Sequence, residues 1–519
     1  MDDYSTELQE FERQRIRLGS LLDEDPAKAV EEARRLPVRS SAGQILYTSL
    51  KASTLIDAGS ATGNRKAIEE GIALFESFRE TDPEDAGSHY NLGNGLVALA
   101  DLQPYQGFDW YLTTAEARRK ARWLFQHAAS RDTEGRILSR ALTNLGNAFS
   151  KAHRWVEAYD AYSRVLEHDG KNGVALTGAA KILLRCIERG IGNAKTLRCV
   201  AARHLSAARQ HPETIKELVG SRAHEDLAKL FEQPAEAGTP PDLRGATDYE
   251  KFVARYRLAL SPTIEGLDRS LKRWDSLRIR SFTEPVSANP GVPALFAMFN
   301  VLKSDFLAAR YLAYQALSEK FTDSGFYSDT LDYAVYGVVP STLTLAQRAC
   351  FDVLDKIAVA TSECLAILRS EKVYFSNRWF RVKKGQPREW HPALRAEVEA
   401  GNTAIIALAE LSLDVEKEGA LHEKKAYRHA STHRFTVLHD MGSEPSRPSP
   451  HIEHCGLSEF RAQLIESLQM ARAAVLYFVE MISIHEAIKK PTVGRVGILE
   501  VPSHHWIRGE DDDTTRLLS

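Results

Sequence analysis

The sequence predicts an all-α protein in which an array of helical repeats precedes a bundle of long helices. Three observations lead to this prediction. Apolar residues recur at helical spacing over most of the 519 residues. A unit of alternating small and large residues returns several times between about residues 42 and 172. After residue 293, five long amphipathic stretches follow one another, which is the pattern of a helical bundle.

Size and charge limit what the chain can be. A length of 519 residues is too great for one core, so several domains are expected. The net charge of −3 gives no overall attraction for nucleic acid, so any basic site must be local. An acidic N-terminus, five scattered cysteines without a C-x-x-C pair and apolar runs too short to span a bilayer predict a cytoplasmic protein without a membrane partner.

Residues 1–41 are expected to form N-terminal helices ahead of the repeats. Apolar residues recur at helical spacing from Glu7 to Leu22. Asp25 and Pro26 then supply the cap and the first residue of a second helix.

The repeat array is placed at 42–232, and its unit is clearest near its middle. Small and large residues alternate there over two helices, at Leu142, Leu145, Gly146, Phe149, Ala158, Tyr162 and Leu166. This unit resembles the tetratricopeptide (TPR) repeat, in which small residues lie where paired helices cross. An earlier copy starts at Tyr90 and holds an insertion around 103–112, and a weaker copy covers 45–83. Stacked copies of such a unit build a curved array.

Both strong copies contain the run Asn-Leu-Gly-Asn. The asparagines are Asn91, Asn94, Asn144 and Asn147. The resemblance implies that asparagines at these positions line the concave groove and hydrogen-bond the backbone of a protein or peptide partner. The alternative is that they are groove positions that merely tolerate solvent, because the helical period fixes only the face.

The chain from 233 to 292 is predicted to be an irregular connection between the two helical domains. Proline and glycine are frequent at 233–247, which is typical of a linker. Residues 248–292 are mixed and end in a second break at Asn289-Pro290-Gly291.

The bundle is placed at 293–490 and a C-terminal tail at 491–519. The tail holds a possible short strand at 494–501 and ends in an acidic segment expected to be disordered. The five bundle helices are expected at 296–317, 343–368, 393–413, 418–438 and 458–488.

The fourth of these helices holds the most concentrated group of potentially catalytic side chains in the sequence. Within 424–434, a strong cation, two imidazoles and two hydroxyls fall in about three helical turns. His429 and His433 are one turn apart on one face, and the guanidinium of Arg428 can reach toward them. The Arg-x4-His spacing resembles the R-x4-6-H motif of the HEPN superfamily, the higher eukaryote and prokaryote nucleotide-binding helical bundles.

The spacing alone does not select this pair. It is also met by Arg122/His127, Arg198/His204, Arg434/His439 and Arg447/His454. The first two pairs lie in the repeat array among packing residues. The third lies further along the same helix as Arg428 and His433, beside the turn at Gly442. The last spans two prolines and cannot lie on one continuous helix.

A second feature of the bundle favours Arg428 and His433. Asp352 and Lys356 lie one turn apart on the second bundle helix. Members of the HEPN superfamily often carry such an acidic-x3-basic pair on the helix that faces the motif. The order of TPR-like repeats followed by this bundle resembles a bacterial HEPN subfamily with N-terminal repeats. The residue after Arg428 is His429, where active members more often have asparagine.

The resemblance implies a metal-independent ribonuclease that needs no cofactor. RNA carries its own nucleophile, the 2′-hydroxyl, so cleavage needs a base, an acid and a cation at the phosphate. We assign His433 the acid-base role and Arg428 the stabilising role, with His429 as a second imidazole. Asp352 and Lys356 would orient or tune them. The resemblance further implies a homodimer, with two motifs across a cleft, acting in bacterial stress or antiphage defence.

A basic and aromatic segment at 371–390 is the predicted RNA-binding surface. Its candidate contacts are Arg378, Trp379, Arg381, Lys383 and Lys384. Cations interleaved with aromatic rings suit phosphate contact and base stacking. The alternative is a solvated loop whose aromatic residues anchor it to the core.

Other interpretations of these residues remain open. His429 and His433 could ligate a metal, but Ala430 stands where a zincin needs glutamate. A metal cluster at His451, His454 and Cys455 lacks a second ligand pair, so surface residues are favoured there. The motif can also be idle. The second hypothesis for function is therefore a non-catalytic TPR scaffold whose bundle binds RNA or a protein.

Overall fold

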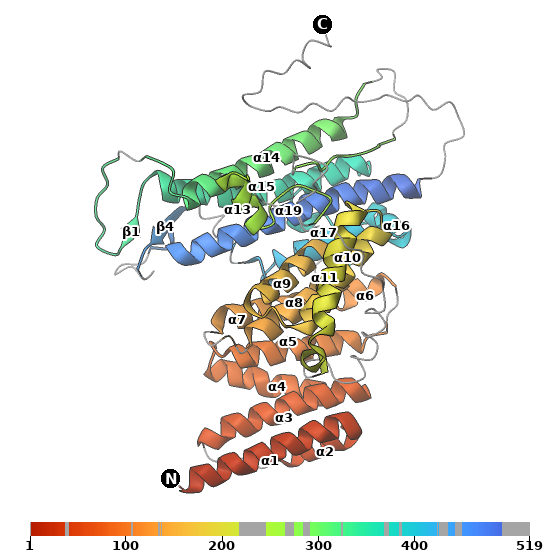
Figure 1. Cartoon of the computed structure of the whole chain (residues 1–519), viewed down its shortest axis with the longest axis vertical. Helices are drawn as coiled ribbons and strands as arrows, with labels where there is room; N and C mark the ends of the chain where they lie inside the picture. The colour runs from red at the N-terminus through yellow and green to blue at the C-terminus, as the bar shows by residue number, and fades with distance from the viewer. Residues whose placement is uncertain are drawn as a thin grey trace.

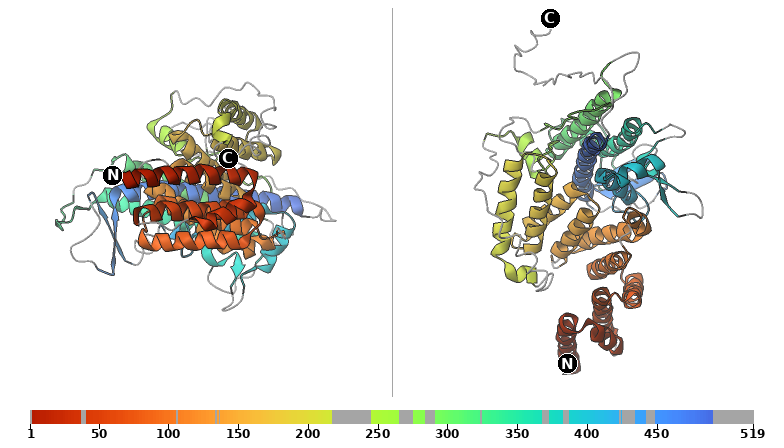
Figure 2. Two further views of the ribbon diagram at one scale, coloured as in Figure 1. Left: turned by 90° about the horizontal axis from the view of Figure 1, so that it is seen from below. Right: turned by 90° about the vertical axis from the view of Figure 1, so that its right-hand side faces the viewer.

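A computed structural model gives the fold and shows it to be all-α with two small sheets (Figure 1). The structure describes residues 2–36, 41–104, 107–132, 135, 137–216, 245–264, 275–283, 291–322, 325–367, 373–382, 387–422, 424, 434–441 and 449–489. The N-terminal helices form a column on which the bundle lies, and the helices of both parts run roughly across its long axis (Figures 1 and 2).

The column consists of helices that pack in chain order. They are α1 (Asp2–Glu24), α2 (Pro26–Arg35), α3 (Ser41–Thr62), α4 (Arg65–Thr81), α5 (Ala86–Asp101), α6 (Asp109–Thr113), α7 (Ala115–Arg131), α8 (Leu138–Lys151), α9 (Trp155–His168), α10 (Gly173–Glu188) and α11 (Ala194–Arg209). Asp25 caps α2 as its sequence predicts, and its side chain accepts a hydrogen bond from the Lys28 N–H.

The two strong repeat copies share the same packing contact. A Cβ atom added at Gly93 would lie 2.6 Å from the Phe125 ring, and one added at Gly146 would lie 2.6 Å from the Tyr162 ring. Both glycines therefore let an aromatic ring lie directly on a helix backbone. The inserted segment between the copies contains α6, where the buried Trp110 donates its indole N–H to the Ala100 carbonyl at 3.2 Å.

The described part of the predicted irregular connection is built into the core. It includes α13 (Asp248–Arg255), which has a capping box between Thr247 and Glu250. Two buried arginines of the bundle hold the chain that follows. Arg310 pairs with Asp275 through two contacts of 2.8 Å, and Arg472 donates to the carbonyls of residues 259 and 264.

Of the five predicted bundle helices, the first and last match their predicted spans, the second is shifted by about one turn, and the third and fourth differ. The bundle helices are α14 (Ala294–Leu317), α15 (Val338–Cys364), α16 (Pro392–Glu399), α17 (Thr403–Asp414) and α19 (Leu457–Ile488). The single helix expected at 393–413 is broken because Gly401 has φ 99°, which an α-helix cannot contain. Helix α19 is long and apolar enough to cross a membrane, but 72% of its most apolar window is buried as the core of the bundle.

The prediction of a helix over 418–438 is wrong at both ends, because residues 418–421 form turns and residues 435–438 form a strand. Phe435–His439 form strand β4, which pairs in parallel with β5 (Ile452–Gly456) and antiparallel with β1 (Ala334–Val335). Phe-Thr-Val-Leu is an apolar run that fits a strand as well as a helix, and its aromatic and β-branched residues favour the strand. A second small sheet pairs β2 (Phe380–Arg381) with β3 (Glu389–Trp390).

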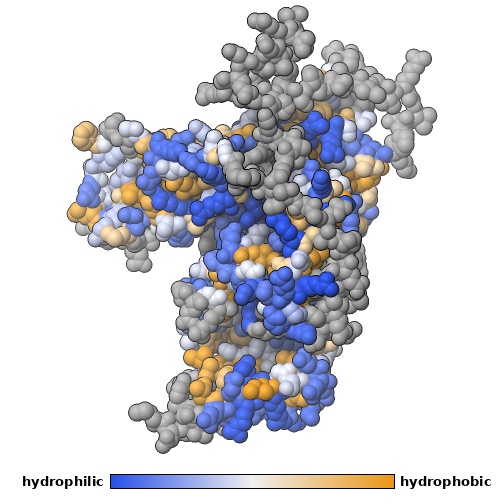
Figure 3. Space-filling model, in the orientation of Figure 1, coloured by the Kyte–Doolittle hydropathy of each residue, from blue (hydrophilic) through white to orange (hydrophobic). Residues whose placement is uncertain are grey.

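The three-stranded sheet lies on an arm that extends to one side of the bundle (Figure 1). Exposed apolar residues gather in and around this sheet, at Phe326, Leu331, Tyr333, Phe435 and Met441. Elsewhere in the view of Figure 3 the surface is mostly hydrophilic, with apolar residues in small groups.

The repeats and the bundle share one hydrophobic core, which runs from Ala100 of α5 to Ile482 of α19. Charged side chains cross the boundary inside this core. Arg122 of α7 is fully buried and bonds to Asp414 of α17 at 2.6 Å and to Glu410 at 3.0 Å. Arg154 of α9 pairs with Asp414 as well.

Each charge in this cluster has an opposite partner. Arg118 pairs with Glu410 at 2.6 Å, and Arg154 pairs with Glu157 at 2.5 Å. Burial alone would raise the pKa of Asp414, but its two arginines outweigh that effect and lower it. The fixed geometry of these pairs sets the position of the bundle on the repeats.

Candidate functional site

The predicted catalytic residues Arg428, His429 and His433 lie outside the described residues, as do Lys383 and Lys384 of the basic segment. The structure does describe both ends of the motif segment. Lys424 marks its start, and β4 follows directly after it. The contacts of these two ends show which helices and strands flank the motif segment.

The start of the segment is tied to the bundle and the repeats through one carboxylate. Lys424 is buried, and its Nζ bonds to Glu466 of α19 at 2.5 Å. The same carboxylate accepts hydrogen bonds from Arg164 of α9 at 3.2 Å and from Gln126 of α7 at 3.0 Å. The Glu466 carboxylate thus bonds to two repeat helices as well as to Lys424, the first residue of the motif segment.

Glu466 stays ionised because of these partners. Burial by itself would raise the pKa of Glu466, but the charges and hydrogen bonds of Lys424 and Arg164 lower it to about 2. The carboxylate is therefore ionised at neutral pH, where it pairs with Lys424.

Replacing Glu466 with glutamine is expected to destabilise the protein in a pH-dependent way. A carboxyl group with a depressed pKa contributes stability above its ordinary pKa of 4.5 and loses it as the pH falls toward 2. At pH 7 the wild type should be more stable than the variant by about 2 kcal/mol. Thermal unfolding at pH 7, 5 and 3 should show this difference shrinking, and a constant difference would refute the ion-pair assignment.

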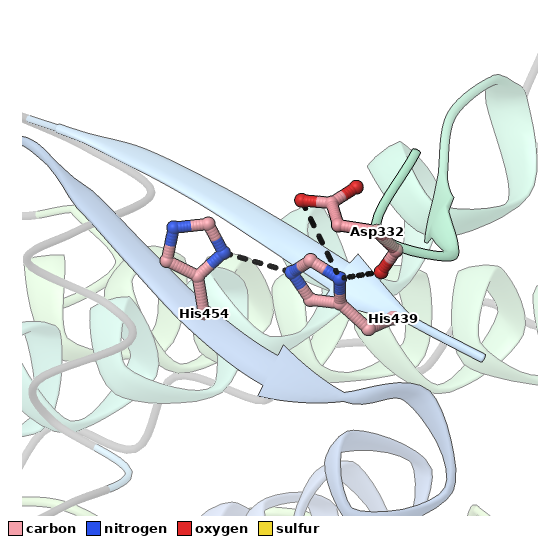
Figure 4. Close-up of side chains that lie close together, drawn as sticks. All are labelled: Asp332, His439 and His454. Carbon is pink, nitrogen blue, oxygen red and sulfur yellow. Dashed lines mark hydrogen bonds and ion pairs between the residues drawn. The ribbon is translucent and has the colours of Figure 1, made fainter. Parts of the chain in front are cut away.

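The end of the segment leads into a cluster of two histidines and one aspartate (Figure 4). His439 ends β4 and is fully buried, and its Nε2 lies 2.8 Å from Nδ1 of His454 on β5. Its Nδ1 lies 2.8 Å from the carbonyl oxygen of Asp332 and 4.0 Å from that residue's Oδ2.

The hydrogen bonds of this cluster assign the protons on both rings. A carbonyl oxygen only accepts, so Nδ1 of His439 carries the hydrogen and Nε2 offers its lone pair to His454. Burial, together with repulsion from His439, lowers the pKa of His454. Within the described part of the chain, Nε2 of His454 is buried and has no hydrogen-bond partner.

The supporting pair lies on α15 as predicted, but its lysine has a partner on another helix. Lys356 is half-exposed and pairs with Asp305 of α14. Asp352 lies one turn earlier on α15. Because α14 and α15 pack along their lengths, the Lys356 ion pair links two bundle helices.

The basic segment needs a correction at Trp379. Its side chain is fully buried against Phe375, with ring centroids 5.4 Å apart, so it has no free face for a base. This tryptophan lies directly before β2 and belongs to the hydrophobic core. Arg381 is exposed on β2. Arg378 is half-buried, and burial lowers its pKa, while two of its guanidinium nitrogens have no partner among the described residues.

Two of the four repeat asparagines, Asn94 and Asn144, are hydrogen-bonded to each other. Asn144 donates to Asn94 at 2.8 Å, so these residues connect the two strong repeat copies. Asn147 accepts from the Tyr162 hydroxyl at 2.7 Å, and its side chain is exposed. Asn91 lies on α5, one turn before Asn94, and is half-buried.

Sequence reasoning missed the cluster of Asp332, His439 and His454. Both histidines belong to Arg-to-His pairs that the sequence disfavours, His439 because of the turn at Gly442 and His454 because of the two prolines before it. Their strands were not predicted, and the signal that could have found them was the β-branched and aromatic run that contains Phe435, Thr436 and Val437.

Comparison with known proteins matches the bundle to one family model. A family model described as LA2681-like HEPN matches residues 286–485. The match runs from before α14 into the last turn of α19, and so includes the motif segment and all three strands of the sheet on the arm. No curated protein matches the chain.

Proposed function

The chain is a HEPN superfamily protein whose residues 286–485 form an LA2681-like HEPN domain, and we propose that this domain cleaves RNA without a metal ion. The observation that carries the proposal is the family match over a range that contains both Arg428 and His433. A HEPN domain favours a role in RNA cleavage or RNA binding. Of the two roles, Arg428 and His433 favour cleavage.

The chemistry follows from the residue types. A neutral imidazole at His433 takes the 2′-hydroxyl proton, or an imidazolium there protonates the leaving 5′-oxygen. Arg428 binds the phosphate oxygens through its planar guanidinium and stabilises the charge that develops on them. His429 is available for the second proton transfer. As the 2′-oxygen attacks phosphorus, the bond from phosphorus to the 5′-oxygen breaks, which leaves a 2′,3′-cyclic phosphate on one product and a 5′-hydroxyl on the other.

The repeats control this site under the proposal. Glu466 connects Lys424, at the start of the motif segment, with Arg164 and Gln126 of the repeat helices. A protein or peptide partner bound along Asn91, Asn94, Asn144 and Asn147 would lie on α5 and α8, which pack against α7 and α9. Such a partner can shift the motif segment between active and inactive positions.

We further propose a homodimer that joins two HEPN domains and places two motifs at one RNA. The setting is the bacterial cytoplasm, in stress or antiphage defence. All five cysteines are buried and none forms a disulfide, which suits a reducing compartment. Arg378 and Arg381 are the described cations that would contact the RNA backbone.

A nuclease assay in the presence of a chelator tests the proposal against the scaffold hypothesis. The purified full-length protein is expected to cut single-stranded RNA in excess EDTA and to leave DNA of the same sequence intact. DNA lacks the 2′-hydroxyl and so lacks the nucleophile. RNA binding without cleavage, over all conditions that include a partner, would favour the non-catalytic scaffold instead.

A further inference from the structure

Asp332, His439 and His454 come from three separate segments and meet on the arm (Figure 4). One ligand atom from each residue lies within 4.8 Å of the others. In the part of the chain that the structure describes, this is the one group of histidine, cysteine or acidic side chains that converges in this way. Two imidazoles and one carboxylate are a ligand set suited to Zn²⁺ and its neighbours in the periodic table.

The hydrogen bonds around His439 prepare it as a metal ligand. Its Nδ1 hydrogen goes to the Asp332 carbonyl oxygen at 2.8 Å, which leaves the Nε2 lone pair directed at His454. Metal-bound histidines commonly donate their second ring N–H to a backbone carbonyl in this way, which fixes the ring orientation.

The carboxylate of Asp332 is oriented as well. Its Oδ1 accepts from the Thr330 hydroxyl at 2.5 Å and from the Ala334 N–H at 3.3 Å, so Oδ2 is the oxygen nearer to His439. The residues on both sides of Asp332 have left-handed backbone angles, with φ 58° at Leu331 and 57° at Tyr333. Residues other than glycine rarely adopt this backbone conformation, and where they do it is often at a ligand-binding site.

We propose that Asp332, His439 and His454 bind one divalent transition-metal ion of the Zn²⁺ class, with one coordination position left for water or another ligand. The metal replaces the hydrogen shared by His439 Nε2 and His454 Nδ1, which now lie 2.8 Å apart. In a tetrahedral site with zinc–nitrogen bonds of about 2.0–2.1 Å, two ligand nitrogens are about 3.3 Å apart. A movement of about half an ångström of the half-exposed His454 side chain reaches this geometry.

The metal joins the chain before β1 to β4 and β5. Because β4 begins two residues after His433, the ion fixes the end of the motif segment while Glu466 fixes its start. None of the three ligands has a role in the proposed cleavage, so metal binding and RNA cleavage are separate measurements. Loss of one proposal leaves the other standing.

Co²⁺ binding to untagged, chelator-treated full-length protein tests the site, because tetrahedral Co²⁺ has visible absorption bands. The wild type is expected to bind one Co²⁺ per chain and to release it to Zn²⁺. His454→Ala should lower the affinity at least about 100-fold, since a direct ligand matters at least as much as its orienting partners. Asp332→Asn keeps an acceptor for the turn hydrogen bonds and should also weaken binding.

The matched control is His451→Ala, which removes an exposed histidine next to β5. It should bind Co²⁺ as the wild type does. Thermal unfolding with and without Zn²⁺ adds a second measurement, in which the metal raises the melting temperature of the wild type and not that of His454→Ala. Wild-type protein that binds no Co²⁺ or Zn²⁺ at one per chain, or a His454→Ala variant that binds as tightly as wild type, would overturn the proposal.

Discussion

Replacing Arg122 with alanine is expected to lower the free energy of unfolding by about 3–5 kcal/mol, the usual effect of breaking a buried ion pair. Arg122 is fully buried, and it donates to Asp414 and Glu410 of the bundle helix α17. Its removal leaves two buried carboxylates with one cationic partner each in place of two. Urea unfolding followed by circular dichroism measures the loss.

Arg65→Ala is the matched control for this experiment. Arg65 is half-exposed and pairs with Glu69 one turn later on α4. A surface pair of this kind contributes about 0–1 kcal/mol, so the control should unfold almost as the wild type does. Equal effects of the two substitutions would show that the interface charges do not hold the bundle on the repeats.

Replacing His433 with alanine is expected to slow RNA cleavage by roughly 10²–10⁴-fold, the usual contribution of an acid-base group. RNA binding should change little, because the phosphate-binding cation Arg428 remains. Arg428→Lys should also lose most of the rate, since a lysine keeps the charge but not the two-pronged contact with phosphate. Single-turnover cleavage of a labelled RNA, with binding measured separately, gives both quantities.

His422→Ala controls for a general effect of removing a histidine near the motif segment. His422 is exposed and has no role in the proposed chemistry. The His422→Ala variant should cleave RNA at the same rate as the wild type. If His433→Ala and His422→Ala cut equally fast, the assignment of His433 falls even if the protein is a nuclease.

The long helices were predictable because their periodic apolar residues have a single interpretation. Both α14 and α19 begin within two residues of their predicted starts and end where predicted. The repeat contacts at Gly93 and Gly146 were predictable for a similar reason, since a small residue at a helix crossing admits an aromatic ring.

The break at Gly401 and the strand at Phe435 were not predictable from the same signals. A single glycine within a helical pattern is often tolerated, and it ends the helix here because the backbone takes φ 99°. A short apolar run such as that at 435–438 suits a helix or a strand, and pairing with residues 452–456 decides between them.

The charged side chains were the least predictable part of the candidate site. Arg122 and Glu466 would be placed on the surface by residue type alone, because charged residues are seldom buried without partners. Their partners lie 292 and 42 positions away in the chain, at Asp414 and Lys424. Only the fold brings such residues together.

The central claim is that Arg428 and His433 cut RNA through its 2′-hydroxyl. The most direct measurement is the chemistry of the product ends, obtained in EDTA with an RNA and with the same RNA carrying one 2′-deoxy nucleotide at the cleavage site. We predict a 2′,3′-cyclic phosphate from the first substrate with wild-type protein, and no cut at that site in the second substrate or with His433→Ala. Cleavage of the 2′-deoxy substrate at the wild-type rate, or product ends with a 5′-phosphate, would contradict the account.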